Sequence, residues 1–185
     1  MPTISITGPL GVGKSTVGQL VAEALHMKFL SMGDILRNPD SYPGVRDIVR
    51  NYDVHSGALL SDQKLCAVLK IVLDHHPEGW VLDGVPRRPL QYTFLKTQVK
   101  TDLFVVLTAN VDLLKARLAV RQETAPRADC TTDKLDYRFE QYEQETLPVI
   151  AEIKADGVPA VFIEVTAEMT PVQIAEKIIE TYKEK

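Results

Sequence analysis

The chain has 185 residues, with 45% hydrophobic residues, 25% charged residues and a formal net charge of -4, which suits one α/β domain with small inserted lobes. The slight negative charge excludes a general attraction to nucleic acid, and Cys66 and Cys130 are too few and too far apart for a disulfide scaffold or a zinc-binding C-x-x-C pair. No run approaches the roughly 20 apolar residues of a membrane span, so we expect a cytoplasmic protein with no membrane or nucleic-acid partner.

Five short apolar runs, most of them rich in β-branched residues, predict strands at 3–7, 28–31, 80–83, 103–109 and 160–165. Two of them, LFVVL and VFIEV, are apolar through most of their length, which is typical of parallel strands covered by helices on both faces. Helical periodicity between the strands predicts helices at 14–25, 62–75, 89–97, 111–122, 132–155 and 170–184. The last of these begins with Thr170 as N-cap and Pro171 at the first helical position.

The stretch GPLGVGKST follows the first predicted strand directly. Its residues Gly8, Gly13, Lys14 and Ser15 fit the pattern G-x-x-x-x-G-K-[ST], and Gly11 adds a further flexible position. In such a loop, successive backbone N–H groups surround a phosphate at a helix N-terminus, the lysine reaches the outer phosphates and the serine serves Mg²⁺. An ordinary glycine-rich turn is the alternative, but the strand before the loop and the amphipathic helix after it favour phosphate binding.

Two stretches, 38–61 and 122–131, fit the alternation of strands and helices poorly. They are either lobes that cover a site or ordinary surface loops.

A phosphate-binding loop alone does not separate a kinase from a GTPase, an ATPase or a transporter subunit. Further segments do: FLSMGDILR (29–37), GALLSD (57–62), VLDGVPRRPLQ (81–91), ARLAVR (116–121) and PRADC with RFEQYEQETLPVI (126–150). In this order and spacing they resemble the adenylate kinases of the short-lid type and their nucleoside monophosphate kinase relatives.

The resemblance implies a three-layer α/β P-loop NTPase fold, in which the first strand lies at the centre of a five-stranded parallel sheet. It also implies one domain over 1–185, with a core at 1–31, 62–121 and 138–185, an NMP-binding lobe at 32–61 and a short lid at 122–137. The expected partners are ATP and AMP, the expected cofactor is Mg²⁺, and we expect a monomer. The short lid leaves no room for the four-ligand zinc site of some relatives, so we expect no zinc.

The activity that the resemblance implies is reversible phosphoryl transfer from ATP-Mg²⁺ to AMP, giving two ADP. Such a reaction brings two polyanions together, and arginines from several segments offset the repulsion. By resemblance, ATP is bound by Gly11, Val12, Gly13, Lys14, Ser15, Thr16, Arg117 and Arg121. Mg²⁺ is held by Ser15 and Asp83, partly through water.

The acceptor nucleotide is assigned in the same way to Met32, Gly33, Arg37, Leu60, Gly84, Arg87 and Gln91. Within this set Arg37 and Arg87 grip the monophosphate, and Gln91 reads the edge of adenine. The lid contributes Arg127 and Asp129. The expected catalytic residues are Lys14, Arg87, Arg121, Arg127 and Arg138.

The chain departs from the family pattern at three positions. Met32 replaces the threonine that favours adenine, so CMP, UMP or a deoxynucleotide is an alternative acceptor. Val85 replaces a phenylalanine and Cys130 an aspartate of the lid, which motivates a second alternative, a nucleotide-binding protein that has lost catalysis. Cys130 is either inert or weakens lid closure.

Overall fold

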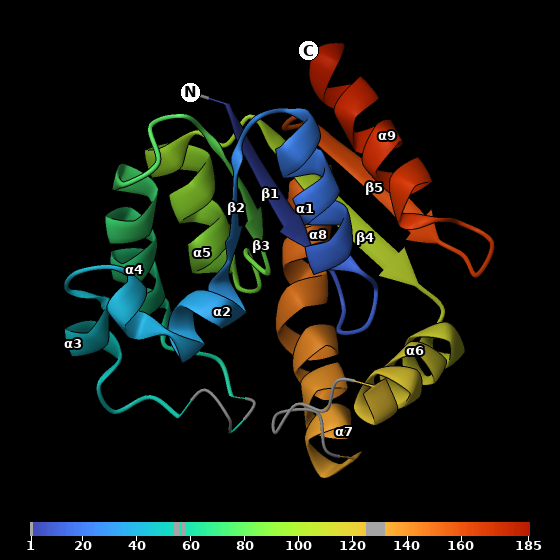
Figure 1. Cartoon of the computed structure of the whole chain (residues 1–185), viewed down its shortest axis with the longest axis horizontal. Coiled ribbons are helices and arrows are strands. Elements are labelled where there is room, and N and C mark those ends of the chain that lie inside the picture. The colour runs from blue at the N-terminus through green and yellow to red at the C-terminus, as the bar shows by residue number, and fades with distance from the viewer. Residues whose placement is uncertain (1, 54–55, 57, 125–131) are drawn as a thin grey trace.

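The computed structural model describes residues 2–53, 56, 58–124 and 132–185 (Figure 1). Its strands are β1 (Thr3–Thr7), β2 (Lys28–Ser31), β3 (Trp80–Asp83), β4 (Leu103–Ala109) and β5 (Ala160–Val165). They form one parallel sheet in the order β2-β3-β1-β4-β5. The predicted strands, the parallel sheet and the central place of the first strand are therefore confirmed.

Helices cover both faces of the sheet. Neighbouring residues of a strand point to opposite faces, so a strand that is apolar throughout presents apolar side chains on both. In β4, Phe104 and Val106 pack into one apolar cluster, whereas Val105 and Leu107 pack into the other. The first cluster includes residues of α4 (Asp62–Asp74), α5 (Pro89–Phe94) and α8 (Leu147–Ala155). The second includes residues of α1 (Lys14–Ala24), α6 (Val111–Thr124) and α9 (Pro171–Lys183). The predicted three-layer α/β fold is confirmed.

Short elements that periodicity did not reveal fill part of the stretch after β2. They are α2 (Met32–Arg37), the 3-10 turn η1 (Pro39–Ser41) and α3 (Val45–Val49). The Ser31 side chain caps α2 by accepting a hydrogen bond from the Asp34 N–H. Helices of five or six residues are too short to show a helical period, which is why the sequence predicted only an irregular lobe here.

The predicted helix 132–155 is confirmed, with one change of hydrogen-bond pattern inside it. It consists of α7 (Thr132–Gln141), the π-helical turn η4 (Tyr142–Thr146) and α8, which follow one another without a break. Pro148, near the start of α8, has no N–H to donate to the carbonyl four residues earlier, which accounts for the change at this point. The helix predicted at 89–97 is likewise α5 followed by the π-helical turn η3 (Leu95–Val99).

Figure 1 shows α2 and α3 on one side of the molecule and α6 and α7 on the other, both beyond the carboxyl ends of the strands. This is the edge at which parallel α/β sheets bind ligands. The proposed limits of the core, the NMP-binding lobe and the lid stay predictions. Among the described helices, none combines the length and the apolar character that crossing a bilayer requires.

Candidate functional site

The loop between β1 and α1 depends on glycine at two points. Gly8 has a φ of +149°, and a Cβ there would lie 2.3 Å from the Leu107 carbonyl oxygen on β4. Gly13 has a φ of +100° and forms the N-cap of α1. The loop therefore lies tightly against the sheet and ends with the N-terminus of α1 directed into the site, as an anion-binding turn requires.

Lys14 lies over this loop. Its Nζ donates hydrogen bonds to the carbonyls of Gly8, at 2.9 Å, and Pro9, at 2.7 Å. Removal of the ammonium group from water lowers the pKa of Lys14 to about 8; Asp83 raises this pKa, whereas Arg87, Arg138 and Arg121 lower it. Loss of hydration is the largest of these effects and the three guanidinium groups add to it, so a polyanion bound beside the ammonium group would raise this pKa again.

The first turn of α1 meets the end of β3 through Ser15 and Asp83. The Ser15 hydroxyl donates to Asp83 Oδ2 at 2.5 Å. Asp83 is 6% exposed, and its Oδ1 is buried without a hydrogen-bond partner among the described residues. A hydroxyl beside a carboxylate with one unpaired oxygen is a donor set that suits Mg²⁺, a hard cation that binds a few protein oxygens together with substrate phosphates. These residues fit the predicted magnesium site.

A cavity of about 400 Å³ opens beside the loop. Arg117 projects from α6 toward it, and its Nη1 donates to the Val12 carbonyl at 3.3 Å. The lining includes one carboxylate, Asp83, and six cations: Lys14, Arg37, Arg87, Arg117, Arg121 and Arg138. Of the residues predicted for ATP, the lining also contains Gly11, Gly13, Ser15 and Thr16.

A second cavity, of about 70 Å³, lies between the stretch after β2 and the loop after β3. All the residues predicted for the acceptor line it: Met32, Gly33, Arg37, Leu60, Gly84, Arg87 and Gln91. Met32 is buried there, and the absence of a side chain at Gly33 leaves room for the Arg37 guanidinium, whose Nη2 would lie 3.1 Å from an added Cβ.

The loop after β3 holds Arg87 between the two cavities. Ser5 and Thr7 of β1 donate hydrogen bonds to the carbonyls of Val85 and Pro86, at 2.5 and 2.6 Å. The Arg87 Nε donates to the Gly84 carbonyl at 2.9 Å, and Thr146 of η4 donates to the Arg87 carbonyl at 3.2 Å. These buried hydroxyl groups fix the backbone from which the Arg87 guanidinium extends.

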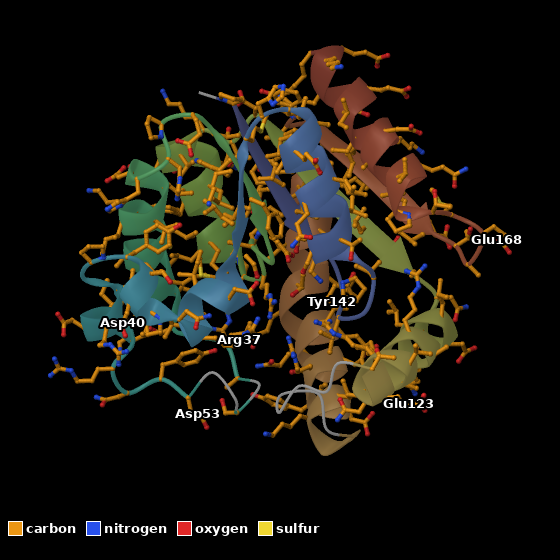
Figure 2. The ribbon with its side chains drawn as sticks, viewed as in Figure 1. Arg37, Asp40, Asp53, Glu123, Tyr142 and Glu168 are labelled. Carbon is orange, nitrogen blue, oxygen red and sulfur yellow. The ribbon has the colours of Figure 1, made fainter. Side chains whose placement is uncertain are left out.

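Arg87 and Arg138 line both cavities, so the phosphate ends of two ligands would meet at these guanidinium groups. Arg37 of α2, which also lines both cavities, lies on one side of this region. Tyr142 of η4, which lines a smaller adjoining cavity together with Lys14, Arg87 and Arg138, lies on the other side (Figure 2). The site is thus assembled from segments distant in the sequence.

The sequence did not single out three charged residues beside the second cavity. Arg88 forms a bidentate ion pair with Glu145 of η4, and its Nη1 lies 3.8 Å from Asp62 Oδ1 at the start of α4. Asp62 in turn accepts a hydrogen bond from Gln91 Nε2. The segments GALLSD and VPRRPLQ contain Asp62 and Arg88, but no spacing rule connects them with Glu145, which lies 57 residues beyond Arg88.

Arg127 and Asp129, predicted for the lid, lie outside the described residues, as does Cys130.

Comparison with known proteins gives consistent matches. The adenylate kinase family model matches residues 6–158. "Adenylate kinase 1" of a Nostoc species is 35% identical over 157 residues, which cover 81% of this chain and 83% of the relative. "Adenylate kinase" of Bifidobacterium longum is 32% identical over 82% of this chain and 86% of its own length, and "Adenylate kinase" of a Synechococcus strain is 30% identical over 92% and 93%.

Proposed function

Because the chain belongs to the adenylate kinase family, we propose that it transfers the γ-phosphoryl group of ATP reversibly to AMP and forms two ADP. The observation that carries this function is the arrangement of the two cavities. One contains the phosphate-binding loop, the other contains Gln91, and Arg87 and Arg138 line both. Two phosphorylated ligands placed in them would have their phosphates adjacent.

The donor would bind in the larger cavity. The backbone N–H groups of the loop and the Lys14 ammonium contact its outer phosphates, and Arg117 lies where the nucleoside extends toward α6. Ser15 and Asp83 would hold Mg²⁺, which when bound neutralises charge on the donor phosphates. We assign the Mg²⁺ requirement on the basis of this pair of oxygen donors.

The acceptor would bind in the smaller cavity, with its phosphate on Arg37 and Arg87 and its base against Gln91. An acceptor phosphate oxygen is already nucleophilic at neutral pH, so the chain needs no general base. Its work is to align the two phosphates and to exclude water. Arg121 and Arg138, which lie along the larger cavity, and Arg127 of the lid would close around the transferred group, and Asp129 would orient Arg127 and Arg138.

The test is product formation from ATP-Mg²⁺ with AMP, CMP, UMP, GMP and dAMP offered separately. We expect AMP to be preferred and Lys14→Met to abolish turnover with every acceptor while the melting temperature shows that the variant is folded. Met32 lines the acceptor cavity, so the panel is repeated with Met32→Thr. A preference of the unaltered protein for CMP or UMP would overturn AMP as acceptor, and absence of turnover with all five would overturn the kinase function.

We also propose that the protein works as a cytoplasmic monomer. Residues of one chain line both cavities, so neither needs a second subunit to complete it. Light scattering of the eluting protein in gel filtration tests this: a mass near the 20.6 kDa of the chain is expected, and twice that mass would contradict it.

A further inference from the structure

The side-chain amide of Gln91 is held at both ends by protein groups. Gln91 is 2% exposed and lines the smaller cavity. Its Oε1 accepts a hydrogen bond from the Arg87 backbone N–H at 2.8 Å, and its Nε2 donates to Asp62 Oδ1 at 2.8 Å. A backbone N–H can only donate and a carboxylate can only accept, so the reversed amide would set donor against donor and acceptor against acceptor. The neighbours therefore impose one orientation of the amide.

Asp62 is itself fixed from several directions. It is the first residue of α4, where the helix dipole favours a carboxylate. The Arg88 guanidinium lies 3.8 Å from its Oδ1 and is held by the carboxylate of Glu145 and by the Leu60 carbonyl, at 3.4 Å. The side chains of Asp62 and Arg88 are both 24% exposed, so this ion pair is partly shielded from water. The carboxylate that orients Gln91 thus has little freedom to turn away.

This arrangement determines what Gln91 offers to a base. Of two Nε2 hydrogens one goes to Asp62, and of two Oε1 lone pairs one is used by Arg87, which leaves one donor and one acceptor side by side in a fixed order. A purine with a 6-amino group presents an acceptor, N1, beside a donor, the amino group. A 6-oxo purine presents the opposite pattern at the same two atoms, N1–H and O6. A glutamine whose side-chain amide could rotate by half a turn would pair with either base pattern.

We propose that Asp62 is a positioning residue that locks the Gln91 amide, and that this lock makes the acceptor cavity select bases with a 6-amino group over 6-oxo bases. The inference rests on the proposed function, because AMP as acceptor identifies which of the two patterns the locked amide matches. Met32, which lines the same cavity, offers no hydroxyl, so hydrogen-bond selection at this edge depends on Gln91. The fixed orientation of the Gln91 amide would allow the cavity to recognise adenine although Met32 stands where the family pattern has a threonine.

The test measures binding without ATP, with AMP and IMP as probes, since these nucleotides differ only at the base edge that Gln91 would contact. Dissociation constants are measured by calorimetry for the unaltered protein and for Asp62→Ala. The unaltered protein is expected to bind AMP at least tenfold more tightly than IMP, and Asp62→Ala is expected to reduce that ratio about tenfold. Most of the change should be weaker AMP binding, with IMP binding unchanged or tighter.

Two variants separate orientation of the amide from general support of the fold. Asp62→Asn keeps an acceptor oxygen within reach of Gln91 and should retain most of the selectivity. Asp74→Asn removes an exposed carboxylate at the other end of α4, far along the helix from Gln91's partner, and should leave the AMP-to-IMP ratio unchanged. An equal fall in the ratio for Asp62→Ala and Asp74→Asn would overturn the proposal. Should Asp62→Ala fail to fold, Asp62→Ser, which shortens the side chain and removes the carboxylate, must lower the ratio instead.

Failure of this inference differs from failure of the proposed function. Equal affinity of the unaltered protein for AMP and IMP would overturn the lock, even if phosphoryl transfer occurs. A high AMP-to-IMP ratio that falls in Asp62→Ala, in a protein without turnover, would support the lock and overturn the kinase function.

Discussion

The Ser15 hydroxyl donates a 2.5 Å hydrogen bond to Asp83 Oδ2, which joins the first turn of α1 to the carboxyl end of β3. The register places Asp83 beside Ile6 of β1, one residue before the strand ends and the phosphate-binding loop begins. The parallel pairing of these strands thus brings an acid from the middle of the chain to the start of the first helix. The second oxygen of this acid, Oδ1, is buried without a partner among the described residues, and a cation would satisfy it.

Replacement of Asp83 should therefore weaken the response to Mg²⁺. Asp83→Asn is expected to raise the Mg²⁺ concentration at half-maximal velocity about tenfold or more, because loss of a group that positions a metal typically costs that much. The measurement is a Mg²⁺ titration of initial velocity at fixed ATP and AMP. Asp74→Asn, at an exposed acid near the end of α4, is the matched control and should leave the titration unchanged. Identical curves for both variants would contradict a metal role for Asp83.

The lowered pKa of Lys14 predicts that nucleotide binding takes up protons. The pKa of about 8 in the free protein rises when phosphates reach the ammonium group, so near pH 8 binding should take up about half a proton. Calorimetric titration of ATP-Mg²⁺ in buffers of different ionisation enthalpy gives this number, with inorganic triphosphate as a second probe. If Lys14→Met takes up as many protons as the unaltered protein at this pH, another group is responsible.

The same shift predicts how stability depends on pH. Because the folded pKa of Lys14 lies below its ordinary value of 10.5, the folded state binds fewer protons than the unfolded state between about pH 8 and 10.5. The destabilisation by Lys14 is full below about pH 8 and diminishes as the pH rises through this window. The difference in free energy of unfolding between Lys14→Met and the unaltered protein should therefore be largest below pH 8. Denaturant unfolding at several pH values would show a constant difference if the shift were absent.

Arg138 lies where the cavities meet, and its loss should affect catalysis more than substrate binding. Arg138→Ala is expected to lower kcat about 100-fold to 1000-fold and to change the KM of either substrate much less, since a group that stabilises charge in the transition state acts mainly on kcat. Lys115→Ala, which removes an exposed cation of α6 outside both linings, is the control and should keep full activity. A rise in KM alone would make Arg138 a binding residue.

Gly8 and Gly13 form a matched pair for the backbone of the loop. Both have positive φ, but an added Cβ at Gly8 would collide with the Leu107 carbonyl, whereas at Gly13 no heavy atom lies within 4 Å. Gly13→Ala is expected to cost about 1 kcal/mol of unfolding free energy from backbone strain alone. Gly8→Ala should cost about 3 kcal/mol or more, because β4 must also move. Urea unfolding of both variants measures the difference, and equal losses would show that the loop can shift away from the sheet.

Much of this protein follows from local sequence patterns. The strands appear at their predicted bounds because buried parallel strands are short apolar runs that need no distant information. Thr170 caps α9 as expected, since a capping box involves only residues three apart. The phosphate-binding loop is likewise a local motif, and each arginine that the resemblance assigned lies in a short segment of its own or beside one other. Periodicity failed for α2 and α3, which are too short to show it, and it gave no sign of the π-helical turn η4 inside the long predicted helix.

The tertiary structure alone shows how these residues come together in space. The segments that contain Lys14, Arg37, Arg87, Arg117, Arg121 and Arg138 were connected only by the resemblance, and the strand order β2-β3-β1-β4-β5 places all of them around one cavity whose described lining has a single carboxylate. The orientation of Gln91 depends on Asp62, which lies 29 residues earlier, and the position of Asp62 depends on an arginine that Glu145 holds from η4. Hydrogen bonds and ion pairs act over a few ångströms of space, whatever the separation of the two residues along the chain. A local sequence pattern therefore does not reveal partners that only folding brings together.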